Sequence, residues 1–173
     1  MATGQEEARS SLAERAVAAM QAGEPDLVQM EIPDLNGALR GKFAAAAKVA
    51  GGGRSAICTV LYQMTPVDDV WESRHSSYDN GFPDVLAVPD LATARVLPWR
   101  QGMGAVLYDV AYPDGRPFPL APRSVLRRVA DRFAETGLTP MFGVEYEAFV
   151  FHADREAQLA GRHHDLTSIG RMA

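Results

Sequence analysis

The first regular pattern along the chain is helical. Apolar side chains, among them Leu12 and Met20, recur at helical spacing over residues 10–23. Gly23 ends the pattern, as a glycine with positive φ commonly does at a helix C-terminus. We therefore predict an N-terminal helix within residues 1–24.

Strand-like segments separated by turn residues follow this helix. Asn36-Gly37 favours a hairpin turn because both residues readily adopt positive φ. The alanine-rich residues 43–50 predict a short helix, and residues 64–81, rich in Asp, Ser and Pro, predict a long loop. The segments that predict strands are 27–32, 38–42, 55–63, 85–88, 94–97 and 105–110.

A second unit begins near the turn Pro113-Asp114-Gly115. Residues 122–136 predict a helix with proline in its first turn, and residues 141–151 form a long β-prone segment without proline, which predicts a central strand. The apolar stripe of this helix consists of Val125, Leu126, Val129 and Phe133. Several short strands with few helices predict an α+β fold.

Composition narrows the class of protein. A chain of 173 residues, 47% of them hydrophobic and 23% charged, is long enough for one or two folded domains. No stretch of about 20 apolar residues is present, and Glu6 and Glu7 near the start are atypical of a secretory signal. A cytoplasmic protein that neither spans nor binds a membrane is therefore expected.

Charge and cysteine content exclude a nucleic-acid-binding protein and a protein stabilised by an internal disulfide. The formal net charge is -5 and Lys and Arg are not clustered, so no surface for nucleic acid is predicted. Cys58 is the single cysteine and lies in an apolar segment, which indicates a small buried side chain and excludes an internal disulfide.

Glu145 and Glu147 are the acidic residues that need explaining. Side chains alternate along a strand, so the two carboxylates would share one face, about 6.5–7 Å apart, on an otherwise apolar segment. They could bind divalent Mg²⁺ or Mn²⁺, or they could face water on an edge strand. The spacing alone favours water, because Glu-x-Glu is common in strands.

The order of several short motifs resembles the N-terminal part of the glutamine synthetase family, especially its γ-glutamyl-amine ligase branch. The resemblance covers nearly the whole chain, from about residue 27 to residue 151. The motifs are IPDLNGALRGK at 32–42, NGFPD at 80–84, PDLAT at 89–93, LPW at 97–99, DG at 114–115, PRSVL at 122–126 and GVEYEAF at 143–149.

This resemblance implies a fold and a reaction. It implies a β-grasp domain over residues 25–109, followed by the beginning of a catalytic domain over residues 110–173. In the family, ATP phosphorylates the γ-carboxylate of glutamate, and ammonia or another amine displaces the phosphate to give an amide. Glu145 and Glu147 match the family's Glu-x-Glu pair, whose members bind different Mg²⁺ or Mn²⁺ ions, the first near the ATP phosphates and the second near the glutamate and amine.

The resemblance also implies a homo-oligomer of the dodecamer type, built from stacked hexameric rings. The β-grasp domain of one subunit completes the active site of the next, so the loop at residues 64–69, with Asp68 and Asp69, would approach a neighbour's amine pocket. The alternative for these two acids is an exposed loop position in water.

Two substitutions and the chain length depart from the family pattern. Ala121 replaces the Asp that caps the following helix, and Ala148 stands where a large residue is common. The family's further carboxylates, histidine and arginines lie in downstream segments, and His163 and His164 are not convincing substitutes. We therefore expect no catalytic residue in this chain and no activity of the chain alone. The alternative function is a non-catalytic β-grasp module that binds a ligand or full-length relatives.

Overall fold

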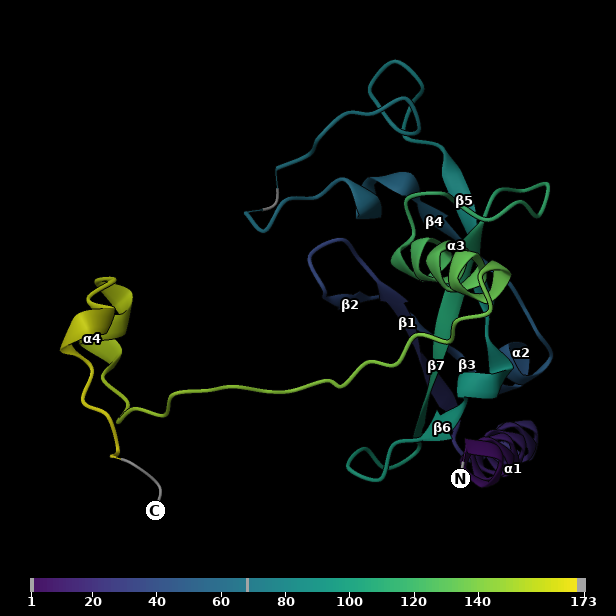
Figure 1. Cartoon of the computed structure of the whole chain (residues 1–173), viewed down its shortest axis with the longest axis horizontal. Coiled ribbons are helices and arrows are strands. Elements are labelled where there is room, and N and C mark those ends of the chain that lie inside the picture. Colours follow the sequence, from purple (N-terminus) through teal and green to yellow (C-terminus); the bar gives the residue numbers. More distant parts are fainter. Residues whose placement is uncertain (1, 68, 171–173) are drawn as a thin grey trace. The chain divides into compact units, whose positions relative to one another are not determined.

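The computed structural model describes residues 2–67 and 69–170. It divides into two compact units, Met1–Leu138 and Thr139–Ala173, and Figure 1 shows the elements of each. The first unit contains the sheet with its covering helices, and the second contains a short helix and irregular segments. The helices in the described residues are all too short or too polar to cross a lipid bilayer.

The predicted N-terminal helix forms as α1, Ala2–Gln21, and begins earlier than its apolar pattern indicated. Met20 is fully buried and joins the core. A Cβ at position 104 would lie only 2.7 Å from the methyl group of Met20, which is too close for two carbon atoms. Glycine at that position therefore allows α1 to approach the sheet closely.

The strands form one mixed sheet with the order β2-β1-β7-β5-β4. β1 runs parallel to β7 at its centre, with Leu27 opposite Met103 and Glu31 opposite Leu107, and the other pairings are antiparallel. The strands are β1 Leu27–Pro33, β2 Leu39–Arg40, β3 Phe43–Ala45, β4 Ser55–Cys58, β5 Asp84–Pro89, β6 Arg95–Val96 and β7 Met103–Ala111. A parallel first and last strand beside an N-terminal hairpin is the β-grasp arrangement, and the predicted α+β class is confirmed.

Alternating apolar residues of the two central strands make the core. One face of β1 and one face of β7 are buried in a core that also contains residues of α1 and of the short helix α2, Ala46–Ala50. The core residues of these strands are Val28, Met30, Ile32, Val106, Tyr108 and Val110.

Two predicted elements of the first unit differ in the structure. Residues 43–50 were expected to be a helix throughout, but Phe43–Ala45 form β3 because their backbone pairs with β1. Residues 55–63 were expected to be a strand, but after β4 the chain turns into the 3₁₀ helix η1, Thr59–Tyr62. In both cases hydrogen bonds to distant residues override the local preference.

Asp34 organises the turn between β1 and β2. Its Oδ1 accepts the backbone N–H groups of Asn36 and Ala38, at 2.9 and 2.8 Å, and its Oδ2 accepts a 2.8 Å hydrogen bond from Arg40. Burial alone would raise the pKa of Asp34, but these hydrogen bonds outweigh it and hold the pKa below the usual value.

Helix α3, Pro122–Glu135, is attached to the sheet through charged groups. Arg123 donates to Asp109 on β7 at 2.7 Å and to Asp90 after β5, and Arg127 donates to Asp109 at 2.7 Å. Its N-cap residue, Ala121, offers no side-chain hydrogen bond, as predicted. The predicted apolar stripe on α3 is largely exposed.

The second unit differs most from the predicted structure. The strand expected over residues 141–151 does not form, and residues 139–150 adopt neither helix nor strand. A strand needs a neighbour to satisfy its backbone groups, and only Phe151 makes a bridge, to Ser168, among the described residues of this segment. The unit also contains the helix α4, Arg155–Leu159.

The Asp34 hydrogen bonds predict a pH dependence of stability. Because the folded pKa is lowered, the contribution of Asp34 is complete above the unfolded pKa of about 3.9 and is lost as pH falls through the folded pKa. We expect Asp34→Asn to be less stable than the wild type at neutral pH, with the difference shrinking toward pH 2. Urea unfolding of both chains across this range measures it, and a difference independent of pH would contradict the assignment.

The position of Arg123 predicts that its loss lowers the stability of the fold more than the loss of an exposed arginine does. Arg123→Met removes one donor from two partly buried carboxylates, which should lower the free energy of unfolding by about 1.5–3 kcal/mol. The control is Arg116→Met, which breaks the exposed pair with Asp114 and should leave stability unchanged. Equal effects of the two substitutions in urea unfolding would disprove a special role for Arg123.

Candidate functional site

Glu145 and Glu147 lie in the second unit, within the extended residues 139–150. Both side chains are exposed, and neither carboxylate has a hydrogen-bond or ion-pair partner among the described residues. Their apolar neighbours are exposed as well, Tyr146 to 97% and Val144 to 81%. The common strand face on which the metal prediction was based is therefore not formed in this structure, and the assignment of Glu145 and Glu147 as metal ligands stays a prediction.

The chemistry of the two carboxylates fits a hard divalent cation. Mg²⁺ prefers oxygen ligands in an octahedral arrangement, and carboxylates are its usual protein ligands. Within the part of the chain that the structure describes, no three His, Cys, Asp or Glu side chains gather closely enough to hold a metal ion. Glu145 and Glu147 could thus supply some ligands of such a site but cannot enclose an ion by themselves.

One histidine of the second unit, His164, pairs with an acid in the 3₁₀ helix η3, His163–Asp165. His164 lies 3.3 Å from Asp165, and Arg162 donates to the same carboxylate at 3.1 Å. These groups form a local surface cluster rather than a site directed toward Glu145 or Glu147.

The loop at residues 64–81 was predicted correctly as irregular, but it is held by specific hydrogen bonds. The hydroxyl of Thr59 donates to Ser76 at 2.8 Å, and Gln63 donates to Ser73 at 2.6 Å. Asp69 is exposed, and its backbone carbonyl accepts the N–H of Thr65. Asp68 lies outside the described residues, so both interpretations of this acid, approach to a neighbour's amine pocket or exposure to water, stay predictions.

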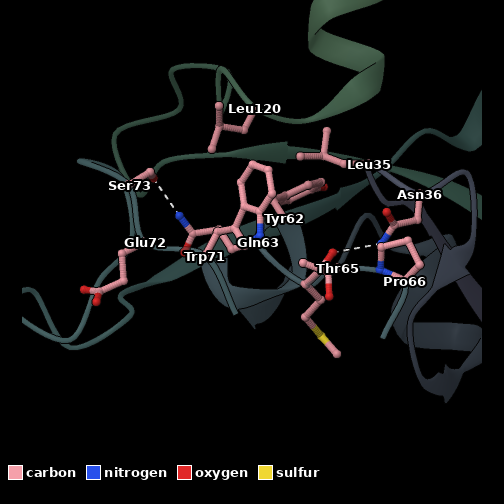
Figure 2. Close-up of a pocket in the computed structure, with 11 residues that line it drawn as sticks. Leu35, Asn36, Tyr62, Gln63, Thr65, Pro66, Trp71, Glu72, Ser73 and Leu120 are labelled. Carbon is pink, nitrogen blue, oxygen red and sulfur yellow. Dashed lines mark hydrogen bonds between the residues drawn. The ribbon is translucent and has the colours of Figure 1, made fainter. Parts of the chain in front are cut away.

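Sequence reasoning missed a cavity beside this loop. It has a volume of about 420 Å³ and is lined mainly by apolar side chains, including Leu35, Tyr62, Trp71 and Leu120 (Figure 2). The sequence feature that could have indicated this cavity is Trp71, a large apolar residue within a polar loop. The cavity could not be inferred from the pattern because its walls come from segments far apart in the chain.

The catalytic-domain part of the chain matches a known family. The sequence model described as "Glutamine synthetase, catalytic domain" matches residues 119–172, which include α3 and both Glu145 and Glu147. This match covers the region in which the metal-binding pair was predicted.

Relatives align with most of the chain. It is 34% identical over 154 residues to a γ-glutamylethanolamide synthetase of Streptomyces coelicolor, covering 87% of this chain and 33% of the relative. It is 31% identical over 136 residues to type-1 glutamine synthetase 2 of Dictyostelium discoideum, covering 73% of this chain and 25% of the relative. The chain therefore spans between a quarter and a third of the length of these relatives.

Solved structures agree with the fold. A structure titled "GmaS/ADP complex-Conformation 1" superposes with a TM-score of 0.52 at 23% identity, covering 90% of this chain and 36% of the other. A structure titled "Crystal structure of novel glutamine synthase homolog" gives a TM-score of 0.53 at 23% identity, covering 78% and 35%. The match to the catalytic-domain model and the 34% identity to the Streptomyces relative over 87% of this chain show that the chain belongs to the glutamine synthetase family.

Proposed function

We propose that this chain is the N-terminal part of an ATP-dependent ligase that joins the γ-carboxylate of glutamate to ammonia or another amine. The observation that carries the proposal is the match of residues 119–172 to the family's catalytic domain, in the segment that contains Glu145 and Glu147. The relatives named above, which make glutamine and γ-glutamylethanolamide by name, support this reaction class.

In the proposed enzyme, Glu145 and Glu147 hold Mg²⁺ or Mn²⁺ through their carboxylate oxygens. Divalent ions supply charge stabilisation where phosphate transfers from ATP to the glutamate carboxylate. Both side chains are exposed and without partners among the described residues, so no ion pair of this chain has to break before they bind a cation. Alternation along a strand would place both on one side once residues 141–151 pair with a neighbour.

Two further features support incorporation into a larger structure. The apolar stripe of α3 is exposed, with Leu126 at 61%, and Phe142 and Phe149 are exposed to 80% and 89%. Large exposed apolar surfaces usually mark contacts with other protein. The proposal accordingly includes a cytoplasmic homo-oligomer of the dodecamer type.

Substitution of the glutamate pair tests the metal assignment. In the complete ligase, Glu145→Gln combined with Glu147→Gln should lower Mg²⁺-dependent ATP turnover by at least about 100-fold, because charge stabilisation at the transferring phosphate is lost. Glu156→Gln, an exposed glutamate of α4, is the matched control and should leave turnover unchanged. Retained turnover in the double variant, measured by phosphate release, would refute the assignment.

The isolated chain should not catalyse the reaction. Two carboxylates leave most of the roughly six coordination positions of each ion unfilled. Purified chain incubated with glutamate, ATP, Mg²⁺ and either ammonia or ethanolamine should therefore yield no amide by mass spectrometry. Amide formed in proportion to chain concentration would show that the site is complete in these residues and would overturn this view.

A further inference from the structure

Arg123 occupies an unfavourable position for the helix that carries it. It lies in the first turn of α3, one residue after Pro122, where the positive end of the helix dipole favours acidic side chains. The described first turn contains no acidic residue, and Ala121 before it supplies no capping side chain. The helix by itself gives no reason for an arginine here, so the reason has to lie in contacts outside α3.

Two carboxylates fixed on the sheet provide those contacts. Asp109 lies in β7, and side-chain alternation directs it away from the core residues Tyr108 and Val110. Asp90 follows β5, and its backbone N–H donates to the carbonyl of Leu107 in β7 at 2.9 Å. The sheet therefore holds both acids independently of α3.

Four charged side chains, Arg123, Arg127, Asp90 and Asp109, form a closed network that we call the ionic latch. Arg123 donates to Asp90 and, at 2.7 Å, to one oxygen of Asp109. Arg127 donates to the other oxygen of Asp109 at 2.7 Å and lies 3.6 Å from Asp90. The side chains of Arg123, Asp90 and Asp109 are only 20%, 22% and 28% exposed. Because two positive charges meet two negative ones, each charge in this partly buried place has opposite partners.

Apolar packing does not hold α3 in the same way. Among the described residues of α3, Ser124 is the buried one, whereas the four side chains of the apolar stripe are 38% to 61% exposed. With about 3.6 residues per turn, this stripe lies on a different side of the helix from Arg123 and Arg127. Figure 1 shows α3 lying across the sheet that contains β7. The orientation of α3 on this sheet therefore depends mainly on the ionic latch.

Helix α3 belongs to both parts of the proposed ligase. The match to the catalytic-domain model begins at residue 119, before α3, yet α3 lies in the compact unit of the sheet, which ends at Leu138. The glutamate pair follows in the same chain after Glu135, the last residue of α3. The ionic latch thus joins the β-grasp sheet to the helix that leads into the predicted metal-binding segment.

We propose that Arg123 and Arg127 are positioning residues of the ligase, which fix the first helix of the catalytic domain on the β-grasp sheet through Asp90 and Asp109. The inference rests on the proposed function and adds to it the way in which the two domains are joined. In this role the four side chains contact neither nucleotide nor metal. They act through the placement of the segment that carries the glutamate pair.

A distance measurement between two spin labels on the full chain tests the attachment. Cys58→Ser removes the native thiol, and Ala56→Cys on β4 and Arg132→Cys on α3 supply two exposed labelling positions. We expect one narrow distance distribution when the ionic latch is intact. Asp109→Asn keeps the size of the side chain but removes the charge that both arginines bind, so the narrow distribution should be lost.

Two further variants complete this measurement. Arg127→Met, at a position 53% exposed and therefore tolerant of substitution, should also broaden the distribution if Asp109→Asn fails to fold. Arg116→Met is the matched control, because it breaks an exposed pair with Asp114 outside the ionic latch and should keep the distribution narrow.

Kinetics of the complete ligase separate positioning from a merely structural role. A loss of folded enzyme lowers turnover but leaves every KM unchanged. Arg123→Met should instead raise the KM for the amine by about 10-fold, because the β-grasp loop expected at the amine pocket is displaced, and leave the KM for ATP unchanged. Arg123→Lys should restore only part of this loss, since one ammonium cannot bridge two carboxylates as a guanidinium does.

Two results would overturn the proposal. One is a distance distribution that stays narrow in both Asp109→Asn and Arg127→Met, which would mean that other contacts hold α3. The other is lower turnover of Arg123→Met with both KM values unchanged, which would reduce the ionic latch to a contribution to folding. The spin-label measurement needs neither ATP nor metal, so it decides the attachment of α3 even if the glutamate-pair variants refute the proposed reaction.

Discussion

The parallel pairing of β1 with β7 is the constraint on which the rest of the first unit depends. It joins residues 27–31 to residues 103–107, two segments that are far apart in the chain. The hairpin on one side and β5 and β4 on the other then add to this pair in the order that the structure shows. Because β7 is long, its second half also pairs with β5 and carries Asp109 toward α3.

Charged groups, more than apolar contacts, attach α3 to that sheet. Asp109 illustrates this balance, because burial alone would raise its pKa, yet hydrogen bonds from Arg123 and Arg127 hold the pKa below its usual value. Apolar side chains on α3, by contrast, remain largely exposed. The helix is thus oriented by a directional network and retains an apolar surface suited to further protein contacts.

The cavity and the glutamate pair represent two kinds of site. The cavity is formed by packed segments that are linked by hydrogen bonds, and its shape exists in the isolated chain. Glu145 and Glu147 lie in residues 139–150, a segment with a β-prone sequence that forms no strand in this structure. A strand's geometry comes from its ladder, so the relative placement of these two carboxylates depends on pairing.

The sequence by itself determined the α+β class, the N-terminal helix, α3, most strand positions and the family. These follow from local periodicity, turn residues such as Asn36-Gly37, and motif order, which are all written along the chain. Only the tertiary structure decided that Phe43–Ala45 is a strand, that residues 141–151 are not, and where the cavity lies. Each of these depends on which distant backbone groups and side chains meet, and local preference carries no information about that.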